Sequence, residues 1–239
     1  MVEQLTLGII IAAALADSIN PCVFGVLIFL LAYMVTVFKN KLKMLIAGLI
    51  YTLVVYITYL LIGLGIFAFT QSTGIVKPFY WFAAIVAILA GFVEIKDYFW
   101  YGRWFSLQMV PGGTEKIKKI SNTMKSMEVK HPLLSLGIAA LLGFVVVLFE
   151  FPCTGAPYLA ILALLSAGDY SSGVPLLLLY NFIFILPLFI IIGVVYFGHT
   201  SKALEKWRKE HRGLMRLATG LFLWALGAYL IYTALHIAG

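Results

Sequence analysis

Six long apolar segments, separated by short polar connections, dominate this chain of 239 residues. They cover residues 5–38, 42–70, 78–98, 133–166, 174–197 and 214–237. Each is long enough for the roughly 20 apolar residues that a helix needs to cross a bilayer. Hydrophobic residues make up 63% of the chain and charged residues 11%, whereas soluble domains carry about 25% charged residues. The sequence therefore predicts an all-α membrane protein, organised as a single membrane domain over residues 1–239.

The first and fourth segments are too long for one simple span. A helix of about 34 residues would reach about 50 Å, against a hydrocarbon core of about 30 Å. Both segments carry a Pro-Cys pair near the middle, Pro21-Cys22 and Pro152-Cys153. Proline removes a backbone hydrogen bond and disfavours helix in the residue before it. We therefore predict that each of these spans is broken into two half-helices, joined at its Pro-Cys pair.

The two Pro-Cys pairs divide the spans into two sets of three, over residues 1–110 and 111–239. Because each set has an odd number of spans, the second crosses the membrane in the opposite orientation to the first. Many transporters are built this way, with discontinuous helices that meet near the midplane. We predict two inverted three-helix repeats that bring Cys22 and Cys153 together. Coincidental prolines in two long helices remain the alternative.

Basic residues predict the orientation in the membrane. With six spans, the connections between them alternate between the two sides of the membrane. Of the 17 lysines and arginines, only Lys77 lies on one side, and the other 16 lie on the opposite side. The others are Lys39, Lys41, Lys43, Lys96, Arg103, Lys116, Lys118, Lys119, Lys125, Lys130, Lys202, Lys206, Arg208, Lys209, Arg212 and Arg216. The positive-inside rule then places both termini outside the cytoplasm. It also explains the net charge of +7 without a nucleic-acid partner; the expected surroundings are membrane lipid.

The position of each cysteine suits redox chemistry. Proline is favoured at the first position of a helix, so Cys22 and Cys153 are expected in the first turn of the following half-helix. Free N–H groups and the positive end of the helix dipole favour a thiolate there, and the thiolate is the nucleophile of disulfide exchange. Two buried, unreactive cysteines are the alternative. The four histidines lie at segment ends without ligand spacing, so we predict no metal and no other cofactor.

Other residues near the two thiols could shape the site. Those expected to form and gate the two helix breaks are Asn20, Pro21, Gly25, Pro152, Gly155 and Pro157. Ordinary helix packing through small residues is an equal alternative for the glycines. Asp17 and Glu150 are the charged residues nearest the thiols. Carboxylates inside a membrane are costly and mark functional positions, so we expect these two to exchange protons with the thiols or to line a water-filled cavity.

The two motifs, LADSINPCVFGVLIFLL at 15–31 and FEFPCTGAPYLAILALL at 149–165, resemble those of the CcdA family, which is related to the transmembrane domain of DsbD. The resemblance covers the whole chain. It implies a membrane thiol:disulfide oxidoreductase of the cell membrane with Cys22 and Cys153 as the redox pair. Such a protein takes two electrons from cytoplasmic thioredoxin and passes them to extracytoplasmic thioredoxin-like proteins, including those of cytochrome c maturation.

Two other functions remain open at this point. A small-solute transporter with inverted repeats would use the broken helices as a substrate site and would need neither thiol. A quinone-linked thiol oxidase would move electrons inward, and the absence of a CxxC pair in the sequence argues against it.

Overall fold

The structure is a computed structural model that describes residues 2–18, 23, 40–100, 119, 132–166, 170–197 and 201–236. The elements in this part are α-helices, as predicted. They are α1 (Val2–Ser18), α3 (Lys41–Thr73), α4 (Val76–Phe99), α6 (Pro132–Ser166), α7 (Tyr170–Tyr196) and α8 (Ser201–His236).

Four stretches of the described helices are long and apolar enough to cross a membrane: Lys41–Thr73, Val76–Phe99, Gly173–Val194 and Lys209–His236. In α1 and α6 the described apolar stretches are shorter, Leu7–Ser18, Leu136–Leu148 and Thr154–Ser166. By length and composition, four of the six predicted spans are confirmed and the chain is a helical membrane protein.

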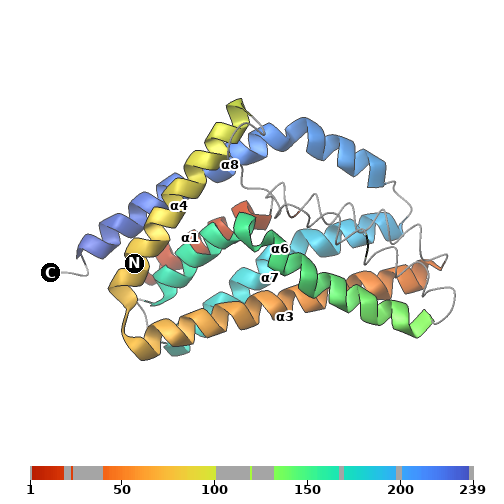
Figure 1. The fold of residues 1–239 in the computed structure, drawn as a ribbon, viewed down its shortest axis with the longest axis horizontal. Helices are drawn as coiled ribbons and strands as arrows, with labels where there is room; N and C mark the ends of the chain where they lie inside the picture. Colours follow the sequence, from red (N-terminus) through yellow and green to blue (C-terminus); the bar gives the residue numbers. More distant parts are fainter. Residues whose placement is uncertain are drawn as a thin grey trace.

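The helices pack in two groups (Figure 1). Helices α4 and α8 lie against each other, whereas α3 packs on α6 and α7, and α1 packs on α7. Gly74 ends α3 with a φ of 67°, in the left-handed region that glycine adopts without strain, and the chain turns directly into α4. The start of α1 and the end of α8 lie at the same end of the molecule as this turn (Figure 1).

Helix α6 connects the two groups. One core cluster is formed by residues of α1, α3, α6 and α7, and a second by residues of α4, α6 and α8. In the second group the α4 and α8 backbones approach closely, because a Cβ atom on Gly91 would lie 2.9 Å from the carbonyl oxygen of Gly220. Small residues at helix contacts permit such an approach in membrane proteins. Helix α6 is therefore packed on two of its faces.

The predicted break in the fourth span is wrong. Helix α6 continues through Pro152 from Pro132 to Ser166, and Figure 1 shows it as one bent helix rather than two separate half-helices. Proline kinks membrane helices without ending them, because side chains and neighbouring helices satisfy the freed backbone groups. The predicted break at Asn20 and Pro21 lies outside the described residues.

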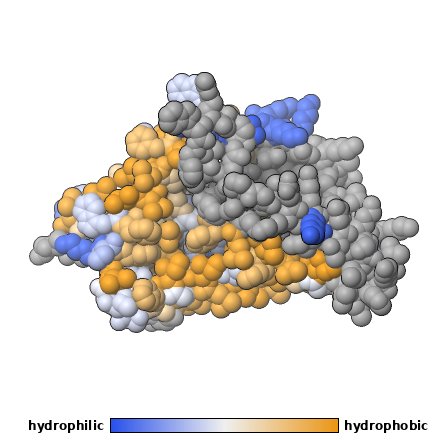
Figure 2. Space-filling view, viewed as in Figure 1, coloured by the Kyte–Doolittle hydropathy of each residue, from blue (hydrophilic) through white to orange (hydrophobic). Residues whose placement is uncertain are grey.

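The outer surface is apolar over long stretches of α3 and α4 (Figure 2). Large exposed side chains there include Leu53, Leu61, Phe82 and Leu89. Such a belt is typical of a surface that faces lipid. Hydrophilic residues gather instead over the first part of α8 (Figure 2), where Lys206 and Glu210 form an exposed pair.

Candidate functional site

A cluster of polar side chains lies buried where α1, α3, α6 and α7 meet. Its members are Asp17, Tyr59, Glu150, Thr154, Tyr158, Tyr180 and Asn181, and none is more than 4% exposed. We call these seven residues the polar cluster. Polar groups inside a membrane protein are costly unless they are paired, so a cluster of this size marks a candidate site. Both carboxyl residues that the sequence analysis selected, Asp17 and Glu150, belong to it.

Tyrosine side chains link the helices of the polar cluster. The Tyr180 hydroxyl in α7 donates to Oδ2 of Asp17 in α1 at 2.9 Å. The Tyr158 hydroxyl in α6 donates to the carbonyl oxygen of Tyr59 in α3 at 2.6 Å, and Asn181 Nδ2 donates to the Tyr158 hydroxyl at 3.3 Å. Gly63 in α3 makes room for this arrangement, because a Cβ atom there would collide with the Tyr158 hydroxyl.

The polar cluster reaches the residues that flank Cys153. The hydroxyl groups of Tyr59 and Thr154 share a hydrogen bond of 2.6 Å between α3 and α6. Thr154 directly follows Cys153, and Glu150 precedes the cysteine by three positions on the same helix. Positions three apart on a helix are neighbours. The backbone of Cys153 thus lies within the cluster, while its side chain and that of Pro152 lie outside the described part.

Glu150 is the acidic residue that α6 contributes to the polar cluster. Its side chain is 4% exposed, and its Oε1 atom has no hydrogen-bond partner within the described residues. It interacts electrostatically with Asp17 of α1 and with Tyr51 and Tyr59 of α3. The structure therefore brings the two predicted carboxyl groups into one electrostatic neighbourhood.

The structure describes only some of the residues that were expected to form and gate the two helix breaks. Asn20, Pro21, Cys22 and Gly25 lie outside the described residues. Val23, which follows Cys22, is 5% exposed and belongs to the same core cluster as Tyr59 and Tyr158.

On α6, Gly155 and Pro157 are buried within the helix. A Cβ atom on Gly155 would lie 3.2 Å from the ring of Phe151, a close contact within the helix itself. The sequence analysis predicted Cys153 in the first turn of a half-helix. This is wrong, because the helix does not restart at Pro152 and Cys153 lies in the interior of α6. The helix-dipole argument therefore does not apply to this thiol.

A second charged cluster was missed by the sequence analysis. Arg216 of α8 is 2% exposed and pairs through Nη1 with Glu94 Oε2 of α4 at 3.3 Å, and also with Asp97 Oδ2. Lys96 adds a contact of 2.6 Å to Asp97 Oδ1. The sequence signal was the pair of acidic residues three positions apart at the end of the third span. The sequence analysis counted Arg216 among the basic residues of the connection after the fifth span, but it is buried between two helices.

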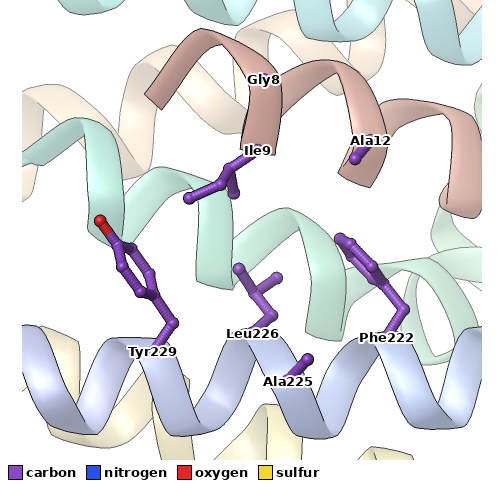
Figure 3. Close-up of a pocket in the computed structure, with 7 residues that line it drawn as sticks. All are labelled: Gly8, Ile9, Ala12, Phe222, Ala225, Leu226 and Tyr229. Atoms are coloured by element: carbon purple, nitrogen blue, oxygen red, sulfur yellow. The ribbon is translucent and has the colours of Figure 1, made fainter. Parts of the chain in front are cut away.

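An apolar pocket lies between α1 and α8 (Figure 3). Its volume is about 370 Å³, and it is lined by Gly8, Ile9, Ala12, Phe222, Ala225, Leu226 and Tyr229. Ile9 points from α1 toward Leu226 and Tyr229 of α8, and Phe222 lies below Ala12. The lining offers little that could position a polar substrate. Among the described residues, His, Cys, Asp and Glu side chains form no group of three or more that could hold a metal ion.

Comparison of the chain with protein-family models, with curated proteins and with solved structures finds no match. The functional argument therefore rests on the two Pro-Cys motifs and on the polar cluster.

Proposed function

We propose that this protein moves two electrons across the cell membrane by thiol–disulfide exchange, with Cys22 and Cys153 as its redox pair. Cytoplasmic thioredoxin is the electron donor. Extracytoplasmic thioredoxin-like proteins, including those that serve cytochrome c maturation, are the acceptors. Both termini lie on the extracytoplasmic side. The first and fourth apolar segments also cross the membrane and complete the six spans.

The observation that carries this proposal is the position of the polar cluster. Glu150 and Thr154 flank Cys153 in sequence, and Asp17 precedes Cys22 by five positions. Residues from the neighbourhoods of both motifs therefore meet in one buried site, although they are far apart in the chain. A thiol pair that exchanges two electrons also exchanges protons, and carboxyl and hydroxyl groups are suited to handle them. Two inert structural cysteines would not require such surroundings.

The contacts between helices support the inverted repeat. If the chain consists of two inverted repeats, each helix of the first repeat has an equivalent in the second. The first apolar segment, which begins with α1, corresponds to α6, α3 corresponds to α7, and α4 corresponds to α8. Two contacts, α3 with α7 and α4 with α8, join equivalent helices. The contact of α3 with α6 has its counterpart in α1 with α7, and that of α4 with α6 has its counterpart in α1 with α8. Such a repeat offers two conformations of similar energy, which a thiol pair would need to meet partners on both faces.

The redox pair is tested by disulfide mapping. The protein is purified in detergent, oxidised, alkylated and digested without a reductant. We expect one peptide pair linked through Cys22 and Cys153, which requires their Cα atoms to come within about 7 Å. Free thiols under oxidising conditions, or links between molecules only, would refute the proposed pair.

The donor is tested by adding reduced thioredoxin to the oxidised protein and following its free thiols by gel shift after alkylation. We expect both thiols to appear. A thioredoxin without its second cysteine, with its remaining thiol activated as a mixed disulfide with thionitrobenzoate, should form a covalent complex with a reduced Cys22→Ser or Cys153→Ser variant and release thionitrobenzoate, because exchange passes through a mixed disulfide. No thiol release and no covalent complex would exclude thioredoxin as the donor.

A small-solute transporter coupled to protons is the second candidate, because buried carboxyl groups also occur on proton pathways of transporters. The double variant Cys22→Ser/Cys153→Ser separates the two functions. A transporter keeps its activity without the thiols, whereas an electron carrier loses all of it.

A further inference from the structure

We propose that the apolar pocket between α1 and α8 binds one acyl chain of a phospholipid. The site does not involve the thiol pair, so it stands whether or not the protein carries electrons. Its depth in the membrane, its open apolar walls and its continuity with the lipid-facing surface all favour this occupant.

The pocket lies at the depth of the lipid chains. Its residues on α8 run from Phe222 to Tyr229, within the 28-residue stretch Lys209–His236 that is long and apolar enough to cross the membrane. At 1.5 Å per residue, Tyr229 lies about 10 Å and Phe222 about 20 Å from the end of this stretch. On α1, Gly8 lies about 9 Å from the start of the helix at Val2. Because these two helix ends lie at the same end of the molecule, both walls place the pocket below the headgroup region.

The pocket follows the length of the two helices (Figure 3). On α8 its residues form a row with Tyr229 at one end and Phe222 at the other, and Ala12 of α1 lies above Phe222. The volume is about 370 Å³. A trough of this size along a membrane-spanning helix suits a chain of methylene groups, which runs in the same direction. It is too small for a helix of a second copy, whose diameter is about 10 Å or more.

The floor of the pocket is part of the core, and its rim is made of small residues. Leu226 is 4% exposed and belongs to the core cluster of α4, α6 and α8, against which Ile9 and Phe222 also pack. Gly8 and Ala225 are exposed, and a Cβ atom on Gly8 would meet nothing within 4 Å. The pocket therefore has a packed floor and opens toward the outside of the helix bundle.

The opening is continuous with an apolar surface. Leu7 and Ile11 of α1 and Leu221 of α8 are next to lining residues in the sequence, and all three are exposed. Helix α8 carries no charged residue between Arg216 and His236. Water does not fill an apolar cavity of this kind, because it finds no polar partners there. At this depth the molecules that surround the protein are lipid chains, so the occupant is hydrocarbon.

The Tyr229 hydroxyl gives the bound lipid a direction. It is the one polar side-chain atom of the lining, and Tyr229 lies at the end of the pocket nearer the end of α8. Tyrosine is favoured near the headgroups, where its ring contacts apolar groups and its hydroxyl meets polar ones. The ester groups of the lipid then lie near this hydroxyl, and the chain runs toward Phe222. In the orientation proposed above, such a lipid belongs to the outer leaflet.

Native mass spectrometry tests the site. The full-length protein is freed of lipid in detergent and titrated with palmitoyl-oleoyl phosphatidylglycerol, and the Kd of the first bound lipid is measured. Gly8→Phe, which places a ring in the pocket, should raise this Kd at least about tenfold, because losing the burial of two CH₂ groups already has this effect. The matched control is Gly65→Phe, since Gly65 of α3 is also exposed and also has nothing within 4 Å of a Cβ atom. It should bind the lipid as the wild type does.

Photolabelling locates the bound chain. A phosphatidylglycerol with a diazirine in the middle of one acyl chain is incorporated into nanodiscs with the wild-type protein, and the labelled residues are mapped by mass spectrometry. We expect residues 222–229 to be labelled more strongly than Phe82 and Leu89 of α4, although these two are 53% and 60% exposed. Gly8→Phe should reduce the labelling of α8 to the level of α4.

An unchanged Kd in Gly8→Phe overturns the proposal, as does wild-type labelling of residues 222–229 that is no stronger than that of α4. If Gly8→Phe does not fold, Ala225→Phe fills the pocket from the opposite wall, and an unchanged Kd in that variant overturns the proposal equally. A protein dimer without bound lipid that Gly8→Phe dissociates would overturn it in favour of a second copy of the chain.

Discussion

The hydroxyl group of Tyr180 in α7 donates a hydrogen bond of 2.9 Å to Oδ2 of Asp17 in α1. Both residues are about 1% exposed, so this bond fixes a carboxyl group inside the membrane part of the protein. It also joins the beginning of the chain to the fifth predicted span. The segment that leads to Cys22 is thereby anchored next to the helix that packs on α3 and α6.

We expect Tyr180→Phe to lower the stability of the protein by about 1–3 kcal/mol, because the variant leaves a buried acceptor without its donor. Thermal unfolding in detergent, followed by tryptophan fluorescence, measures the change. Tyr232→Phe removes a hydroxyl from a side chain that is 60% exposed and serves as the matched control. Equal stability of the two variants would show that the bond to Asp17 contributes nothing.

Gly63 and Gly65 provide a test of the polar cluster on one helix. Gly63→Ala would place a methyl group against the Tyr158 hydroxyl, whereas Gly65→Ala meets nothing within 4 Å. We expect Gly63→Ala to destabilise the protein by about 1–3 kcal/mol, as overpacking does. Gly65→Ala should be neutral or stabilising, because alanine favours the helix. The same unfolding assay checks both, and a neutral Gly63→Ala would contradict the described position of Tyr158.

The ion-pair cluster between α4 and α8 predicts a strong effect of one arginine. Arg216→Met removes the buried cation shared by Glu94 and Asp97 and leaves the partly exposed Lys96 as their recorded basic neighbour, and we expect a loss of about 3–5 kcal/mol. The triple variant Arg216→Met/Glu94→Gln/Asp97→Asn, which removes all three charges, should recover part of this loss. Lys206→Met, at a side chain that is 79% exposed, should have little effect. A triple variant less stable than Arg216→Met would argue against charge burial as the cause.

Particular helices show how far the sequence could predict the fold. The segment 42–70 is α3, which extends over Lys41–Thr73, because an uninterrupted apolar run and a turn at Gly74 define it. The apolar segment 214–237 covers only the later part of α8, because this helix begins at Ser201. Hydropathy detects the part of a helix inside a bilayer, but Ala203, Leu204 and Lys206 favour helix outside it as well.

The candidate site was also predictable only in part, because the sequence does not show which distant residues meet in the fold. Asp17 and Glu150 could be selected because charge is rare in apolar segments. Their tyrosine partners could not, because Tyr59 and Tyr180 look like ordinary residues of apolar spans, and the bond from Tyr180 to Asp17 joins positions 163 apart. The buried role of Arg216 depends on partners 119 and 122 positions away. Proline at 152 predicted a break, but tertiary packing keeps α6 continuous.

The proposed orientation, with both termini outside the cytoplasm, rests on the charge distribution and can be checked in intact cells. Single cysteines are placed in a background without Cys22 and Cys153, one near each terminus and one in the connection 101–131. We expect a membrane-impermeant thiol reagent, added outside, to label both termini and not the connection. Labelling of the connection with protection of the termini would mean the opposite orientation, and thioredoxin would then meet the other face.

Electron transfer across a sealed membrane tests the central claim most directly. Proteoliposomes are prepared with a disulfide-bonded fluorogenic peptide inside, and thioredoxin with its reductase and NADPH is added outside. The wild-type protein should reduce the trapped disulfide, because electrons flow from thioredoxin, near −270 mV, to a more oxidising acceptor. Liposomes with Cys22→Ser or Cys153→Ser protein should not differ from empty ones. A trapped peptide that stays oxidised with the wild-type protein, or that is reduced equally with either variant, would contradict transmembrane electron transfer by this thiol pair.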